Sequence, residues 1–200
     1  MLRSTPHFEN GALTCDGPTK TFTITVNPSA QVNQPSSQVI CNGLQTSTVS
    51  FTTATTGGTA TYTWTNSTTA IGLPATGTGN IAAFSALNAG TSPVTATIVV
   101  TAHFDHGAVS CDGPTKTFSI TVNPTAEADQ PANQVLCNGN TTLLVAFTTT
   151  NTGGTPTYSW INTTPSVGLA ATGSGDIAAF TAINAGSTPV TATVVVTPAF

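Results

Sequence analysis

The chain has 200 residues, of which only 5% are charged, and its formal net charge at pH 7 is −4. Folded domains usually carry about 25% charged residues, so we expect none of the basic patches that bind nucleic acid or an anionic membrane. Nowhere do eighteen apolar residues follow one another, which argues against a transmembrane helix. Valine, isoleucine, phenylalanine and threonine are abundant, and because disordered chains are poor in β-branched and aromatic residues, we expect this chain to fold.

The sequence repeats itself at an offset of 96 residues. Residues 15–28 recur as residues 111–124 with a single change, Thr23 in the first copy and Ser119 in the second. The same offset relates the other landmarks: Cys41-Asn-Gly43 and Cys137-Asn-Gly139, Trp64 and Trp160, and Asn88-Ala-Gly90 and Asn184-Ala-Gly186. A fixed period defines the unit of the fold, and this one has the size of an immunoglobulin-like β-sandwich, which takes about 100 residues.

Period-two alternation indicates β-strands, and no stretch has helical periodicity. Phe22, Ile24 and Val26 alternate with threonines, which predicts a half-buried strand. The Asn-Pro that follows ends this strand, because proline cannot donate a ladder hydrogen bond. The copy at residues 117–122 reads the same way, so we place unit boundaries after Pro28 and after Pro124.

Residues 29–124 therefore form one complete unit with seven short strands, which is typical of a sandwich. Trp64 and its copy Trp160 lie on the expected third strand, where such sandwiches bury their largest core side chain. We expect residues 77–79 and 103–114 to be loops. In chain order, the expected extended segments are 31–34 with 38–41, 46–53, 59–66, 81–87, 94–103 and 117–122.

The two ends of the chain complement each other. Residues 1–28 supply only the last loop and strand of a preceding unit, whereas residues 125–200 supply a unit that lacks its last strand. A sheet without its closing strand exposes an unpaired edge beside an open core. In one interpretation, which we favour, the chain is an excerpt of a longer array of flanking repeats. In the other, residues 1–28 of one copy complete the last unit of another by donor-strand exchange, and because such head-to-tail contacts do not close, the product is a fibre.

The four cysteines occupy equivalent places in the repeat. Cys41 and Cys137 precede Asn-Gly, and Cys15 and Cys111 precede Asp-Gly-Pro. No histidine or further cysteine stands at metal-ligand spacing from them. In a threonine-rich β-protein this pattern indicates disulfides and hence an oxidising, extracellular compartment. The alternative is that the cysteines are free thiols buried in the fold.

Several of these motifs together resemble the PKD-like repeats found in tandem in large secreted surface proteins of Bacteroidetes. They are Cys41-Asn-Gly43, the Thr-Gly-Gly-Thr before Tyr62-Thr-Trp64, Gly79-Asn-Ile81, residues 88–101 and residues 111–124. The resemblance covers the whole chain. It implies an all-β fold of tandem immunoglobulin-like (PKD-like) sandwiches, export to the cell surface, a role as stalk, adhesin or filament, and no catalytic residues.

The resemblance also implies a disulfide between Cys41 and Cys111 inside the complete unit. Closing this loop would stabilise the unit by about 4 kcal/mol. Cys15 and Cys137 would then bond to the neighbouring unit or subunit. The rival connectivity joins Cys15 to Cys41 and Cys111 to Cys137 across unit boundaries. We rank it lower, because a strand that spans about 25 Å, a linker and a second extended piece separate each pair.

Other candidate sites have simpler explanations. His103-Phe-Asp-His106 has the residue types of a metal site, but its copy His7-Phe-Glu-Asn10 keeps only one histidine, which favours a solvated loop. We expect surface ion pairs between Asp112 and Lys116 and between Asp16 and Lys20. Rows such as Thr61, Thr63 and Thr65 would suit ice or a sugar, although threonine is also favoured on any exposed strand.

From these patterns we expect a structural protein of the cell surface, a repeat-built stalk or filament subunit of a bacterial adhesin. Its partners would be copies of itself in a head-to-tail homopolymer, or the flanking repeats of a longer chain. We expect no enzymatic activity, no cofactor and no metal, and neither nucleic acid nor membrane insertion. The alternative function is a carbohydrate- or ice-binding sandwich that uses its threonine faces.

Overall fold

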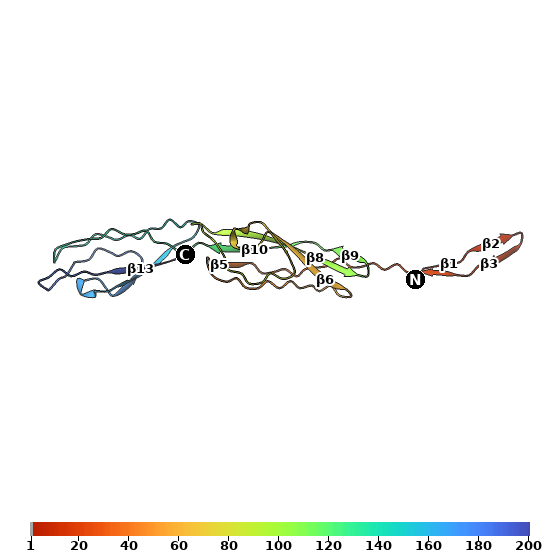
Figure 1. Cartoon of the computed structure of the whole chain (residues 1–200), viewed down its shortest axis with the longest axis horizontal. Helices are drawn as coiled ribbons and strands as arrows, with labels where there is room; N and C mark the ends of the chain where they lie inside the picture. Colours follow the sequence, from red (N-terminus) through yellow and green to blue (C-terminus); the bar gives the residue numbers. More distant parts are fainter. Residues whose placement is uncertain (1) are drawn as a thin grey trace.

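The computed structural model describes residues 2–200, which form an elongated molecule built from β-strands. Figure 1 shows N-terminal hairpins at one end, a complete unit in the middle and a last unit at the other end. The helical residues in the described part form two single turns, η1 (Thr69–Ile71) and η2 (Pro165–Val167). Neither is long or apolar enough to cross a membrane. The expected all-β fold is therefore confirmed.

One mixed sheet dominates the middle unit. Its strand order is β5-β10-β8-β6-β7, and β9 pairs with the far end of β8. Only β5 and β10 run parallel, and the other pairs are antiparallel. The strands are β5 (Gln38–Cys41), β6 (Thr59–Asn66), β7 (Thr76–Thr78), β8 (Val94–His106), β9 (Val109–Asp112) and β10 (Lys116–Asn123).

Two irregular segments pair with each other through isolated bridges. Val49 bridges to Ile81, and Gln45 bridges to Ser85. Their inward side chains, among them Val49, Phe51 and Ile81, share one buried cluster with the inward side chains of the sheet. The unit is thus an immunoglobulin-like sandwich with one regular sheet and one loosely paired layer.

The structure changes four details of the predicted strand map. Residues 31–34, the first expected extended segment, are not a strand. Residues 46–53 and 81–87 pair through an isolated bridge and a few further hydrogen bonds and are not regular strands. A loop was expected at residues 77–79, but Thr76–Thr78 form β7 at the edge of the sheet. Residues 103–114 form a hairpin, because β8 continues to His106, turns at Gly107 with a φ of 64° and returns as β9.

The last unit repeats only part of this plan. Its sheet has three strands in the order β12-β11-β13, formed by β11 (Thr157–Asn162), β12 (Thr172–Ser174) and β13 (Val194–Ala199). Three residues make up its buried apolar cluster, namely Phe147, Trp160 and Ile177. Residues 134–137, the counterpart of β5, are not a strand. The physical reason is that β5 pairs only with β10, and no described residue of the last unit takes the place of β10.

The N-terminal segment keeps its local pairing without a sandwich behind it. β1 (Leu2–Ser4) pairs with β4 (Lys20–Phe22), and β2 (His7–Asn10) pairs with β3 (Leu13–Asp16). The register is that of the middle unit, since Phe22 lies opposite Leu2 as Phe118 lies opposite Ile98. β2, β3 and β4 are exposed along their whole length.

Candidate functional site: the position of the closing strand

The closing strand of the middle unit, β10, lies between two neighbours. It pairs antiparallel with β8 from Lys116 to Val122 and parallel with β5 from Ile120 to Asn123. Its inward side chains Phe118, Ile120 and Val122 are 5%, 0% and 0% exposed. Burying such side chains contributes about 1.5–3 kcal/mol each, so this strand is an integral part of the core.

Three polar contacts also hold the backbone of the closing strand. The amide of Gln34 donates from Nε2 to the carbonyl oxygen of Thr117 at 2.7 Å. The backbone N–H of Ser119 donates to Ser37 Oγ at 3.0 Å. Near the end of the strand, Asn88 Nδ2 donates to the carbonyl oxygen of Val122 at 2.7 Å. These bonds fix the register of the strand by contacts that come from outside the sheet.

We call residues 20–28 the donor segment, because they are the exposed copy of this strand. Its residues Phe22, Ile24 and Val26 are 55%, 69% and 87% exposed. Only Lys20–Phe22 is assigned as a strand. A sequence almost identical to a strand whose inner face is fully buried is therefore presented to solvent, with the side chains that would form a core left uncovered.

In the last unit, we call the free edge of β13 the acceptor edge, together with the apolar side chains of Val194, Val196 and Leu136 beside it. β13 pairs with β11 on one side, and no described strand covers its other side. Val194 and Val196 are only half-buried. Their equivalents in the middle unit, Ile98 and Val100, are fully buried. Leu136 is exposed to 38%. Edges of this kind are templates for another strand.

Two polar anchors of the acceptor edge lack the contacts that their copies make. Asn184 Nδ2 donates only to the carbonyl oxygen of Thr188, whereas Asn88 also reaches the closing strand. Gln130, the copy of Gln34, donates only to its neighbour Pro131. The missing acceptors in both cases are backbone carbonyl groups of a closing strand.

The hairpin that precedes the closing strand is built around histidine. His103 Nδ1 lies 2.7 Å from Asp112 Oδ1, and its Nε2 lies 2.8 Å from Thr63 Oγ1. His7 and Asp16 repeat the first contact at 2.6 Å. We had predicted that these aspartates pair with Lys116 and Lys20. That prediction is wrong, because each aspartate pairs with a histidine instead. Within residues 2–200 no three metal-binding side chains gather.

The structure does not bring Cys41 and Cys111 together, and it leaves all four cysteines as free thiols. Cys41 lies opposite Asn123, at the end of the closing strand, whereas Cys111 lies opposite Phe104, before that strand begins. The eight residues Lys116–Asn123 between them span about 25 Å. A disulfide joins Cα atoms less than about 7 Å apart, so this geometry does not fit the expected bond inside the unit.

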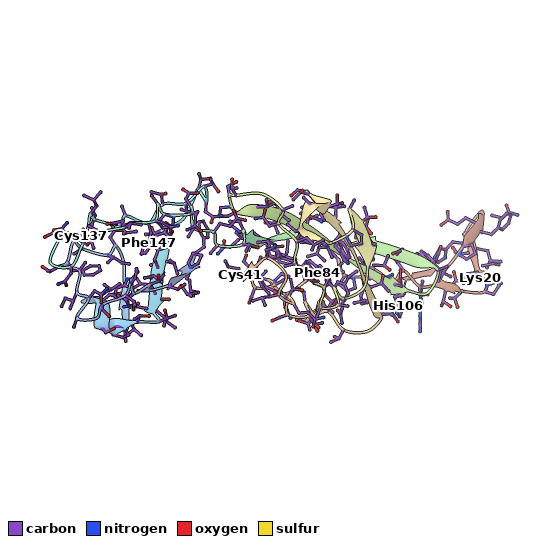
Figure 2. All side chains as sticks on the ribbon, turned by 60° about the vertical axis from the view of Figure 1, so that its left-hand side comes forward. Lys20, Cys41, Phe84, His106, Cys137 and Phe147 are labelled. Atoms are coloured by element: carbon purple, nitrogen blue, oxygen red, sulfur yellow. The ribbon has the colours of Figure 1, made fainter. Side chains whose placement is uncertain are left out.

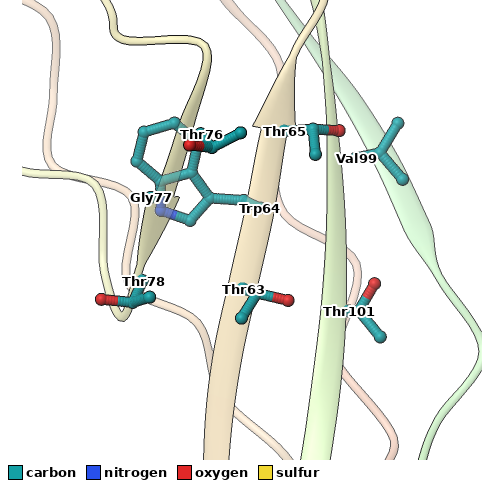
Figure 3. Close-up of a pocket in the computed structure, with 8 residues that line it drawn as sticks. All are labelled: Thr63, Trp64, Thr65, Thr76, Gly77, Thr78, Val99 and Thr101. Atoms are coloured by element: carbon teal, nitrogen blue, oxygen red, sulfur yellow. The ribbon is translucent and has the colours of Figure 1, made fainter.

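The alternative candidate site is the set of exposed threonines on the edge strands of the middle unit. A hollow opens over the edge strands of the middle unit, and Trp64 lies at its floor (Figure 3). The indole lies against Gly77 of β7, where any added Cβ would overlap the ring. Trp64 is only 7% exposed, so the hollow offers hydroxyl groups and no open aromatic face. It is lined by Thr63, Thr65, Thr76, Thr78, Val99 and Thr101 in addition to Trp64 and Gly77.

The inner face of β6 is aromatic and apolar. Tyr62 packs against Phe51 with their ring centroids 5.6 Å apart, and burial raises the pKa of the Tyr62 phenol. Trp160 is 7% exposed, like Trp64, and belongs to the cluster of the last unit. These aromatic residues act in packing, which leaves the donor segment and the acceptor edge as the exposed features that packing does not explain.

Comparisons with known proteins name no family. No family model matches the chain, and no curated protein matches its sequence. Among solved structures, the chain is similar to the FN1–FN3 domains of chicken CNTN1, at 11% identity and a TM-score of 0.36. The similarity covers 98% of this chain and 75% of that one. An identity and a TM-score this low identify neither a family nor a function.

Proposed function

We propose that this protein is a structural, non-catalytic component of an extracellular stalk or filament of a bacterial adhesin. In this proposal the sandwiches follow one another in a line, and each unit is completed by a closing strand. In a solution of the 200-residue chain, the donor segment of one copy fills the acceptor edge of the next. The chains then join head to tail.

The difference in exposure between the two copies of the closing strand carries this proposal. Phe118, Ile120 and Val122 are buried where a sandwich surrounds them, and the same residue types at 22, 24 and 26 are exposed where none does. The acceptor edge offers a closing strand the kind of neighbours that β10 has in the middle unit. These are an unpaired strand edge and the side-chain amides of Gln130 and Asn184, which do not reach a closing strand. The occupant that fits is thus already present in the chain.

The extracellular setting is supported by composition and not by a site. Cysteines recur at fixed positions in a threonine-rich β-protein, and such proteins form disulfides in oxidising compartments. A surface with only 5% charged residues offers little repulsion between copies. Both features suit a protein that assembles with itself outside the cell.

Size-exclusion chromatography with light scattering, followed by negative-stain electron microscopy, tests the assembly of the purified chain under reducing conditions. We expect linear oligomers with a repeat of about 40 Å per sandwich. Ile24→Asp should abolish them, because an unpaired carboxylate would be buried in the acceptor edge at a cost of several kcal/mol. Since Ile24 is 69% exposed in the free chain, this substitution leaves the monomer folded.

Thr23→Asp is the matched control. It adds the same charge at the adjacent position, but on the outer face of the strand, as the half-exposed Ser119 shows. Assembly should survive this change nearly unaltered. A monomeric wild-type chain, or equal loss of assembly in both variants, would refute strand complementation.

A further inference from the structure

The two cysteines of a complete unit lie at its opposite ends along the molecule. Figure 2 shows Cys41 at the end that faces the last unit, and His106, on the hairpin that carries Cys111, at the end that faces the N-terminal segment. Cys111 is half-buried and Cys41 is exposed. Each cysteine therefore faces a junction between units and not the other cysteine of its own unit.

The junction between the N-terminal segment and the middle unit shows what each cysteine meets. Asn27 Nδ2 donates to the carbonyl oxygen of His106 at 3.2 Å, at the turn of the hairpin that carries Cys111. Three residues further on, the carbonyl of Ala30 packs so closely against Gly113 that a Cβ at Gly113 would overlap it. The end of one closing strand thus lies against the hairpin of the following unit.

The repeat then places the cysteine partner of Cys111. Asn27 is the copy of Asn123, and Asn123 lies opposite Cys41 in the parallel pair of β10 and β5. Neighbouring strands are about 5 Å apart. In a unit closed by the donor segment, the residue at the position of Cys41 would therefore lie beside Asn27, next to the hairpin of the following unit.

The junction between the middle unit and the last unit has the same arrangement, with Cys41 at the end of the middle unit. The backbone N–H of Thr152 donates to the carbonyl oxygen of Thr91 of the middle unit at 2.8 Å. Phe200, where the hairpin of the last unit would begin, packs against Gly154 beside this contact. Figure 1 places the C-terminus next to the middle unit. A hairpin added after Phe200 would project toward the end of the middle unit that carries Cys41.

We propose that disulfides in this protein cross the junctions between consecutive units. The inference rests on the proposed strand complementation. When a second copy completes the last unit, its hairpin carries Cys15 to Cys41 of the first copy. In the same way, Cys137 at the outer end of the last unit meets Cys111 of the second copy.

Each bond forms by oxidation of two thiols. The two cysteines lose two protons and two electrons, and a small-molecule disulfide such as oxidised glutathione takes them up and becomes two glutathione thiols. The product locks the exchanged strand at both ends of the completed unit. Noncovalent assembly precedes this step and does not require it.

The experiment first assembles the chain with reduced thiols and scores the oligomers by light scattering. Oxidised glutathione is then added, free thiols are blocked, and the material is cleaved with trypsin and chymotrypsin for mass spectrometry without reduction. We expect peptides that join Cys15 to Cys41 and Cys111 to Cys137. Absence of reduced oligomers would refute strand complementation itself. Assembled material with Cys41–Cys111 or Cys15–Cys137 links, or with none, would refute only the junction disulfides.

Paired variants keep the test independent of peptide mapping. Cys111→Ser with Cys137→Ser leaves only Cys15 and Cys41, which we expect to give a ladder of covalent oligomers on a non-reducing gel. Cys41→Ser with Cys111→Ser leaves Cys15 and Cys137, which should give no ladder although assembly is unchanged. The opposite result in the two variants would overturn the proposed pairing.

Discussion

Trp64 illustrates how single residues set the edge of the sheet. Its indole extends across β7, and the absence of a side chain at Gly77 makes room for it (Figure 3). Trp160 repeats the arrangement over Gly173 and donates from Nε1 to the carbonyl oxygen of Gly175 at 3.1 Å. The glycine in each Thr-Gly-Thr or Thr-Gly-Ser strand is thus part of the packing of the tryptophan and does not mark a loop.

Gly77→Ala should destabilise the middle unit by about 1–3 kcal/mol, because its methyl group would overlap a rigid ring in a packed core. Gly90→Ala is the control, since its Cβ would meet only Asn88 Oδ1 at 3.3 Å. Urea unfolding measures both, with Trp160→Phe in every sample so that Trp64 alone reports by fluorescence. Equal midpoints for the two variants would show that the indole does not need the glycine.

Sequence patterns predicted the strands that have one clearly apolar face. The extended segments expected at residues 59–66 and 94–103 agree with β6 and β8. The hairpin after His103 was missed, because its exposed residues have no apolar alternation to reveal a strand. A histidine paired with an aspartate across it was the available signal, and it occurs in both copies.

At the scale of elements, the closing strand shows that alternation alone does not make a strand. Residues 117–122 form one because β8 and β5 flank them. The nearly identical residues 21–26 form only the short ladder of β4 with β1. The sequence could predict the face that this strand would bury, but not whether a partner would be present.

β1 and the acceptor edge compete for the same side of the donor segment. Leu2 lies opposite Phe22 in the free chain, and its copy in the last unit is Val194 of β13. Exchange must therefore release the three-residue ladder of β1, which we expect to contribute about 1–2 kcal/mol. Deleting residues 2–4 should speed assembly roughly tenfold in a light-scattering time course.

The deletion needs a control at the same site. Combining it with Ile24→Asp should stop assembly, because growth would still depend on the donor segment entering the acceptor edge. Growth of the doubly changed chain would mean that the deletion had exposed some other adhesive surface. An unchanged rate in the simple deletion would show that β1 does not block exchange.

At the scale of the whole molecule, the two units differ in how much core they bury. The cluster of the middle unit includes the fully buried residues Ile98, Val100, Ile120 and Val122, whereas three residues form that of the last unit. Segments with few buried contacts open at low free energy. The last unit should therefore gain most of its stability from the strand that completes it.

A synthetic peptide of residues 20–28 should supply that stability in trans. The experiment uses the Ile24→Asp chain, which keeps an intact acceptor edge but does not fill it. Excess peptide should slow amide hydrogen exchange in residues 190–200 on the order of tenfold, because it pairs with the free edge of β13 and gives the amides of Gln130 and Asn184 carbonyl partners. The same peptide carrying Asp at the position of Ile24 should have no effect, since its carboxylate would have to be buried opposite Ala192, the copy of the Ala96 that lies opposite Ile120. Equal protection by both peptides, or by neither, would mean that the acceptor edge does not recognise the donor segment.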